Sequence, residues 1–241
     1  MAAAVARVCE PGHAGVELLL APRALVPAPS TTSFTPSGAH IAILDSSFNP
    51  PTLAHIAMAS TLFPPPDPGA YTARLLLYSA RNADKTPKHG DAAPAQRAEM
   101  MLLAARSVGP AGSGGSGAGV GSGTGVALVS EPTFVAKSTA LVQALSQQQQ
   151  QQQKGTPPPA LTFLVGTDTL VRIFDPKYYP ASGLGAALDA LFAHAWLVCC
   201  ARGTADELRE QDALLARPDV AVWVRQGKIR LLPPLQGYED R

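Results

Sequence analysis

The chain has 241 residues, of which 46% are hydrophobic, and a formal net charge of +1, a composition that suits one sizeable α/β domain with a buried core. The balanced charge argues against a nucleic-acid partner, and no apolar run reaches the roughly 18 residues that cross a membrane. Cys9, Cys199 and Cys200 lack metal-binding spacing, so we expect no metal ligands and an intracellular protein of the cytoplasm or nucleus.

Three stretches of the chain have biased compositions. Residues 1–36 are rich in alanine and proline, and we expect a flexible leader there; a removed targeting segment is the alternative. Residues 37–241 then form the domain. Within it, residues 109–125 are a Gly/Ser stretch and residues 146–159 are a Gln tract closed by prolines, and both predict surface insertions.

From residue 40 onward, strand and helix patterns alternate. Strands are expected at residues 40–44, 73–78, 126–130, 160–166, 195–200 and 228–232, and helices at 52–63, 93–108, 133–146, 167–174 and 204–216. Helical spacing places the apolar faces of the first two helices at Leu53, Ile56, Ala57 and Ser60, and at Met100, Leu103 and Ala104. The strands are apolar without alternation, which predicts an α/β fold with a Rossmann-like, doubly wound parallel sheet. Such sheets bind ligands beyond the carboxyl ends of their strands.

The segment LDSSFNPPTLAH, residues 44–55, joins the first strand to the first helix. We expect the helix to begin near Pro51 or Thr52, since proline is favoured at the first helical position. The unpaired N–H groups and the positive dipole end of that helix favour a phosphate. His55 lies one turn into the helix, so its ring can lean back over the same terminus; taken alone, it would equally suit a surface or core position.

The ten residues SSFNPPTLAH, 46–55, resemble the Gly-Ser-Phe-Asn-Pro-x-Thr-x-x-His motif of nicotinamide mononucleotide adenylyltransferases, within the nucleotidylyltransferase superfamily. The form LDSSFNPPTLAH is most similar to a fungal and algal branch. The resemblance implies that His55 is catalytic and donates a hydrogen bond to the α-phosphate. It further implies a set of nucleotide-binding residues in the same loop: Ser46, which stands at the glycine position, Ser47, Phe48, Asn49 and Thr52, which stands where the superfamily often has a first histidine.

A second stretch, FLVGTDTLVRIFDPKYY, ends a strand at Gly166, where a bare backbone permits close approach of a ligand. Asp168 follows, and a helix cap is one interpretation of it. The resemblance implies instead that Gly166 and Asp168 form a nucleotide-binding Gly-x-Asp. It also implies a phosphate contact from Lys85, which could equally lie in a solvated loop, and a family position for Arg97, which could equally be an exposed helix residue.

Taken together, the resemblance implies transfer of AMP from ATP to nicotinamide mononucleotide, giving NAD and pyrophosphate, with Mg²⁺ bridging the triphosphate. The expected partners are ATP and nicotinamide mononucleotide; the oligomeric state stays open. The alternatives are another acceptor such as a phosphopantetheine or phospho-sugar, ATP hydrolysis, or nucleotide binding without catalysis. The family's last motif, Ile-Ser-Ser-Thr-x-x-Arg, has no counterpart before Arg241, which implies weakened activity. No Gly-x-Gly-x-x-Gly follows a strand, which argues against a dinucleotide-dependent oxidoreductase.

Overall fold

The computed structural model describes residues 1–22, 38–61, 71–81, 89–109, 123–179, 183–200 and 205–232. Its strands are β1 (Val16–Leu20), β2 (His40–Asp45), β3 (Ala73–Ser79), β4 (Thr124–Val129), β5 (Ala160–Gly166), β6 (Ala195–Cys200) and β7 (Ile229–Leu232). Its helices are α1 (Ala2–Cys9), α2 (Leu53–Ser60), α3 (Pro94–Ser107), α4 (Phe134–Gln152), α5 (Thr167–Ile173), α6 (Leu184–His194), α7 (Ala205–Ala216) and α8 (Pro218–Arg225). Every strand and helix predicted beyond residue 40 is present, whereas α6 and α8 were not predicted.

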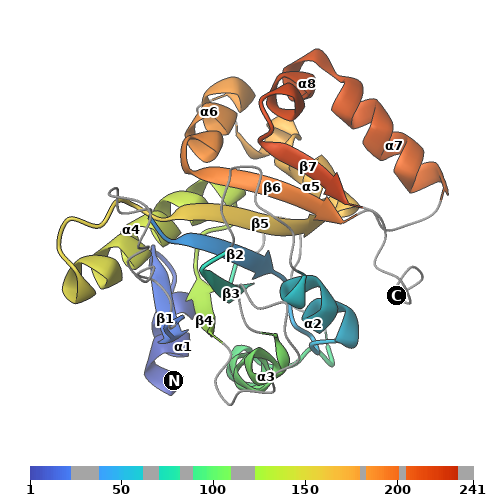
Figure 1. Cartoon of the computed structure of the whole chain (residues 1–241). Coiled ribbons are helices and arrows are strands. Elements are labelled where there is room, and N and C mark those ends of the chain that lie inside the picture. The colour runs from blue at the N-terminus through green and yellow to red at the C-terminus, as the bar shows by residue number, and fades with distance from the viewer. Residues whose placement is uncertain are drawn as a thin grey trace.

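The strands form one sheet in the order β1-β4-β3-β2-β5-β6-β7 (Figure 1). Every neighbouring pair is parallel except β1 and β4. The chain therefore builds the sheet outward from β2 through β3 to β4, returns to the other side of β2, and continues through β5 to β7. This is the strand order of a doubly wound Rossmann sheet, so the predicted fold class is confirmed.

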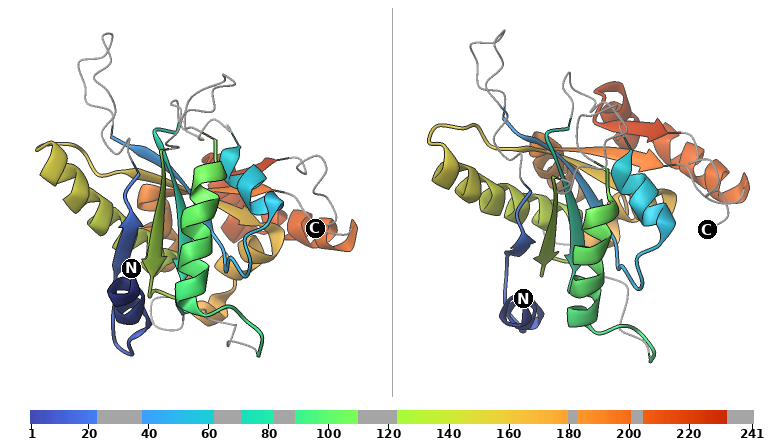
Figure 2. Two further views of the ribbon diagram at one scale, coloured as in Figure 1. Left: turned by 90° about the horizontal axis from the view of Figure 1, so that it is seen from below. Right: turned by 60° about the horizontal axis from the view of Figure 1, so that its bottom comes forward.

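Helices cover both faces of the sheet, because neighbouring residues of each strand point to opposite sides. Ile41 and Ile43 of β2 belong to the core on which α4, α5, α6, α7 and α8 pack. Ala42 and Leu44 belong to the core covered by α1, α2 and α3. Figure 2 shows α2 and α3 together on one side of the sheet and α4 on the other. Burial on both faces explains why the strands are apolar without alternation.

The predicted apolar faces of α2 and α3 are only partly confirmed: Ile56 and Ala104 pack against the core. Leu53 is 68% exposed and Leu103 is 60% exposed, whereas the buried residue of α2 is Ala59. Helix α3 buries Arg97, Ala98, Met101 and Ala105. Both helices have apolar residues on more than one side, so the spacing of apolar residues is compatible with two different buried faces. The stripe with small alanines packs on the sheet, where it allows the helix backbone to approach closely.

Residues 1–22 differ from the expected flexible leader. Helix α1 buries Val5 and Val8, and β1 extends the sheet by pairing Val16 with Val129 of β4. Arg7 joins the helix to the strand through an ion pair of 2.6 Å with Glu17, which lowers the pKa of that carboxyl group. Strand β1 is short, and its partner lies more than a hundred residues away in the sequence, so local patterns do not reveal the pairing. Residues 23–36 lie outside the described ranges.

The Gln tract also differs from the expected insertion, because α4 continues through it to Gln152. Leu141, Leu145 and Gln149 are buried at a spacing of four residues, so Gln149 extends the apolar stripe of the helix. Glutamine is a good helix former and needs no other reason to continue a helix. In the Gly/Ser stretch, Thr124 and Gly125 belong to β4, while residues 110–122 fall outside the described part.

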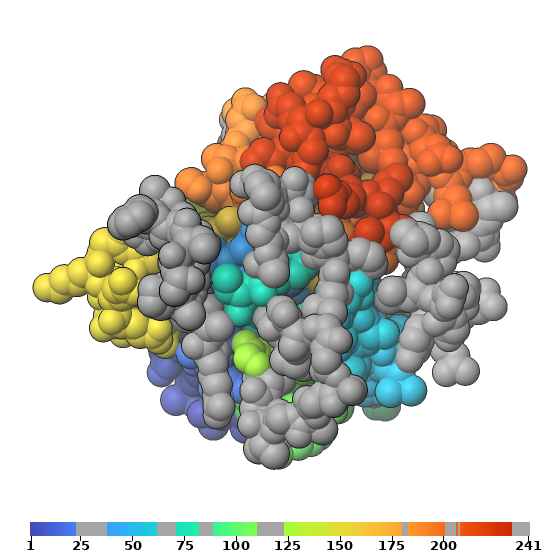
Figure 3. Space-filling view, viewed as in Figure 1, coloured from blue at the N-terminus to red at the C-terminus, as the bar shows by residue number. Residues whose placement is uncertain are grey.

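The outer surface is formed partly by α2, which lies at the right of the space-filling view, and by the C-terminal elements at its top (Figure 3). Among the described helices, none combines the length and the apolar character that crossing a membrane requires.

Candidate active site

The reversal of strand order between β2 and β5 marks the candidate site. The chain leaves these two neighbouring strands in opposite directions along the sheet, toward β3 and toward β6. Leu44 pairs with Leu164 in register, so the segments that begin two residues later, at Ser46 and Gly166, leave the sheet side by side. Ligands of doubly wound sheets bind at this point, beyond the carboxyl ends of the strands.

The β2–α2 loop has a fixed backbone. The Ser46 N–H donates to the Leu77 carbonyl at 3.1 Å and so continues the ladder between β2 and β3 by one residue. Ser47 is exposed, but the Phe48 side chain is fully buried in the core under α2 and α3. The φ of Phe48 is 44°, which is uncommon for a bulky residue and is often found at functional loops. The buried ring anchors the loop and leaves only the backbone of Phe48 for a ligand.

His55 bends back over the start of α2, as its spacing predicted. Its Nδ1 accepts the Thr52 N–H at 3.0 Å and lies 2.7 Å from the Thr52 hydroxyl. Its Nε2 lies 2.8 Å from the Ser46 hydroxyl, and its ring packs against Phe48 with 5.3 Å between ring centroids. Because Nδ1 accepts a backbone N–H, the ring proton lies on Nε2, which donates to Ser46. Thr52 is the cap of α2, so Pro51 precedes the helix rather than opening it.

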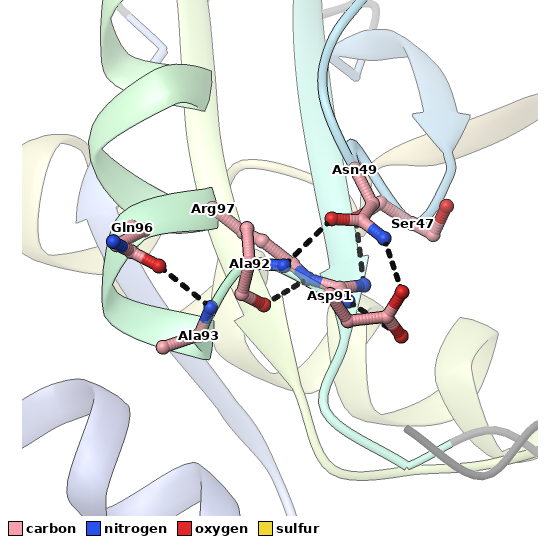
Figure 4. A network of polar contacts seen from close by, with 7 residues as sticks. All are labelled: Ser47, Asn49, Asp91, Ala92, Ala93, Gln96 and Arg97. Atoms are coloured by element: carbon pink, nitrogen blue, oxygen red, sulfur yellow. Dashed lines mark hydrogen bonds and ion pairs between the residues drawn. The ribbon is translucent and has the colours of Figure 1, made fainter. Parts of the chain in front are cut away.

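Asn49 fastens the loop to the segment before α3. Its amide nitrogen donates to Asp91 at 2.8 Å, and its amide oxygen accepts the Ala92 N–H at 2.9 Å (Figure 4). Both ends of the side chain are therefore engaged by residues 91 and 92. In this structure Asn49 therefore shapes the loop from the side of α3, and its contact with a nucleotide stays a prediction.

Gly166 and Asp168 lie at the carboxyl end of β5. Gly166 is the cap residue of α5 and has no side chain to bond its N–H groups, and Asp168 follows in the first turn, so Asp168 does not cap this helix. The Asp168 side chain is 70% exposed and pairs with Arg172 at 2.5 Å. A Cβ atom added to Gly166 would lie 3.1 Å from the Asp168 carboxylate. The absence of a side chain at Gly166 thus leaves room for the exposed Asp168 carboxylate at the edge of the sheet.

Sequence reasoning missed a buried ion pair at the same edge. Lys137, in the first turns of α4, lies 2.5 Å from the carboxylate of Asp45, the last residue of β2, and their side chains are 6% and 7% exposed. The Ser79 hydroxyl donates to the other Asp45 oxygen at 3.2 Å. Lys137 precedes Leu141 by four residues in the buried stripe of α4, and this spacing was the available signal. The pair fixes the end of β2 from which the loop departs.

Two buried thiols lie near this edge in β6. Burial raises the pKa of Cys199 to about 12 and that of Cys200 to about 11. Both thiols therefore stay protonated near neutral pH and are poor nucleophiles.

Two sequence-predicted residues remain, Lys85 and Arg97. Lys85 lies outside the described residues. Arg97 is buried, with 8% exposure, so its alternative interpretation as an exposed helix residue is wrong. Within the described ranges, no group of three or more His, Cys, Asp or Glu residues could hold a metal ion.

We compared the chain with family models and with curated proteins. No family model matches the chain. The chain is 30% identical over 162 residues to a protein from Schizosaccharomyces pombe named "Putative nicotinamide mononucleotide adenylyltransferase". The match covers 67% of this chain and 53% of the relative, so the chain spans about half the length of the curated relative. This similarity confirms the resemblance that the motif after the first strand predicts.

Proposed function

We propose that this chain transfers AMP from ATP to nicotinamide mononucleotide, giving NAD and pyrophosphate. One observation carries the proposal: the Nε2–H of His55 is held over the start of α2, at the point where the strand order reverses, and Asp168 stands on the neighbouring strand's helix. The similarity to a protein named as an adenylyltransferase supports this choice of reaction.

The reaction requires positioning and charge stabilisation more than covalent chemistry. A 5′-phosphate oxygen of nicotinamide mononucleotide attacks the α-phosphorus of ATP. The bond from that phosphorus to the bridging oxygen breaks, and pyrophosphate leaves with the electron pair. Negative charge grows on the α-phosphate oxygens in the transition state. A donor already aimed at that charge lowers the barrier, because no reorganisation is needed when the charge develops.

His55 is suited to be that donor. Thr52 fixes Nδ1, and Phe48 supports the ring, so Nε2–H keeps one direction. In the proposed complex, a phosphate oxygen replaces the Ser46 hydroxyl as its acceptor. The N–H groups of Leu53 and Ala54, which lie in the first turn of α2 outside the capping box of Thr52 and His55, and the helix dipole add favourable interactions with the same anion. The exposed carboxylate of Asp168 can accept hydrogen bonds from ribose hydroxyls.

Mg²⁺ enters the proposal as the companion of ATP. Magnesium is usually held by one or two carboxylates together with substrate phosphates, and it retains several waters. Asp45 is held by Lys137, whereas the carboxylate of Asp168 is exposed at the edge of the sheet and would have to leave its ion pair with Arg172 to contribute. When bound, the ion neutralises triphosphate charge.

The test is NAD formation by the purified chain with ATP, nicotinamide mononucleotide and Mg²⁺. We expect His55→Ala to lower kcat by about 10²–10³, the usual cost of losing one donor to a developing oxyanion. His194→Ala, at the exposed end of α6, is the matched control and keeps the wild-type rate. Wild-type protein that forms no more NAD than His55→Ala would overturn the proposal. Product analysis with other phosphate acceptors, and of ADP, then identifies the reaction that replaces it.

A further inference from the structure

Arg97 of α3 is a buried arginine that reaches into the β2–α2 loop. Its Nε donates to the Ala92 carbonyl at 2.8 Å, and Nη1 donates to the Ser47 carbonyl at 3.2 Å. Its Nη2 lies 3.3 Å from Asp91, and the guanidinium carbon lies 5.5 Å from the centroid of the Tyr78 ring. Figure 4 shows the side chain extending from α3 toward the loop, between the two segments that it joins.

The contact with Ser47 sets the direction of a peptide group. In a trans peptide, the carbonyl and the following N–H point in opposite directions. The Ser47 carbonyl points to Arg97, so the Phe48 N–H points away from α3. Among the described residues, this N–H has no hydrogen-bond acceptor. Helix α3 packs over β3 and β4, so the N–H points away from the α3 side of the loop.

Asp91 couples this contact to the next loop residue. One of its oxygens contacts Arg97, and the other accepts the Asn49 side chain. The loop is therefore held at three consecutive residues: at Ser47 by Arg97, at Phe48 by the core, and at Asn49 by Asp91. The Asp91 carboxylate takes part in two of these attachments, because it contacts Arg97 and accepts a hydrogen bond from Asn49. A loop fixed at consecutive residues presents its N–H groups in one arrangement, which is what an anion site requires.

We propose that Arg97, oriented by Asp91, is a positioning residue that aims the Phe48 N–H at the phosphate bound by the loop. The inference rests on the proposed function in one respect: that function identifies the bound phosphate as a phosphate of ATP. Arg97 itself touches no substrate: it acts through the Ser47–Phe48 peptide. Lysine is a poor substitute, because one ammonium cannot bond the carbonyls of Ser47 and Ala92 and the Asp91 carboxylate in the same fork.

The test compares Arg97→Met, Arg97→Lys and Asp91→Asn with wild type. Arg106→Met is the matched control, since Arg106 is an exposed arginine on the same helix. Three quantities are measured: the Kd for ATP by calorimetry, kcat and KM for NAD formation, and hydrogen–deuterium exchange of the peptide that covers residues 45–52. Thermal unfolding separates a loss of fold from a loss of loop geometry, and Asp91→Asn retains the size of the side chain if Arg97→Met fails to fold.

We expect Arg97→Met to lower kcat/KM for ATP by about 10- to 100-fold, the cost of a small misplacement of a binding group. Arg97→Lys and Asp91→Asn give smaller losses in the same direction. Exchange in residues 45–52 becomes faster, whereas exchange in β5 and β6 stays unchanged, and Arg106→Met matches wild type throughout. A purely structural role predicts faster exchange across the whole domain and losses that follow the unfolding temperature.

The outcomes separate this inference from the proposed function. If wild type forms NAD, and the Arg97 and Asp91 variants equal it in Kd, kcat/KM and loop exchange, the positioning role is overturned and the adenylyl transfer stands. If wild type forms no NAD, but binds ATP more tightly than Arg97→Met, the reaction is overturned and the positioning role stands. If wild type binds no ATP, both are overturned.

Discussion

At the scale of single residues, the buried ion pair between Asp45 and Lys137 is a contact that the sequence did not predict. Two charges taken out of water are stable only while each compensates the other. Here the Ser79 hydroxyl donates to the second carboxylate oxygen, so both oxygens of Asp45 have a partner. The pair holds the last residue of β2 to the start of α4 and therefore determines where the candidate loop begins.

Replacing Lys137 by methionine keeps the volume of the side chain but leaves the Asp45 carboxylate buried without its cation. We expect the free energy of unfolding to fall by about 3–5 kcal/mol, measured by urea denaturation. Lys154→Met, at an exposed position, should change it by less than about 0.5 kcal/mol. The double variant Asp45→Asn/Lys137→Met should recover part of the loss. Equal stabilities of Lys137→Met and wild type would show that the pair does not hold the strand end.

Residue-scale prediction from the sequence was uneven for a physical reason. His55 and Thr52 are three residues apart on one helix turn, so local spacing places them together. Asp91 and Arg97 meet the loop only because α3 packs beside it, and the sequence contains no local sign of that contact. The nucleotide contact of Asn49 stays a prediction. Its contacts with residues 91 and 92 could not be predicted, because the motif gives the type of a residue but not the partner that a distant segment supplies.

At the scale of elements, the N-terminal elements α1 and β1 contribute to the stability of the domain. Val8 is fully buried against the face that also holds Phe48, and β1 covers the edge of β4. An uncovered edge strand exposes unpaired backbone groups to other chains. The first twenty residues are thus part of the folded unit rather than an attachment to it.

Val8→Ala tests this role without deleting the segment. We expect the free energy of unfolding to fall by about 1.5–3 kcal/mol, because two buried methyl groups are lost at about 0.8 kcal/mol each and the cavity that they leave adds to the cost. Val224→Ala is the matched control, because Val224 is 39% exposed in α8 and should contribute little. Chemical denaturation of both variants gives the comparison. If the Val8→Ala protein is as stable as wild type, residues 1–22 behave as the flexible leader that the sequence predicted.

Strands and helices were predicted correctly where their own residues form a recognisable pattern. The predictions failed where packing against distant segments determines the extent of an element. Apolar runs between turns located six strands, because all of them except β7, in which Leu231 is exposed, are buried on both faces. Helix α4 runs further than predicted, since a buried stripe that starts at Lys137 continues into the Gln tract. The low complexity of that tract made it resemble an insertion, but glutamine residues extend a helix that is already anchored in the core.

At the scale of the whole molecule, the strand order brings the parts of the site together. Alternating strands and helices predicted a parallel sheet, but the order of the strands follows from packing between distant segments. That order makes β2 and β5 neighbours, so the loop bearing His55 and the turn bearing Asp168 leave adjacent strands. We therefore expect one nucleotide to contact both segments, with its α-phosphate at the start of α2.

A crystal structure of the chain with α,β-methylene-ATP and Mg²⁺ tests this claim most directly. We predict an α-phosphate oxygen about 2.7–3.2 Å from His55 Nε2, with the bond from His55 to the Ser46 hydroxyl broken. The ribose should lie on the side of Asp168. A nucleotide bound elsewhere on the molecule, with His55 still 2.8 Å from Ser46, would contradict the account.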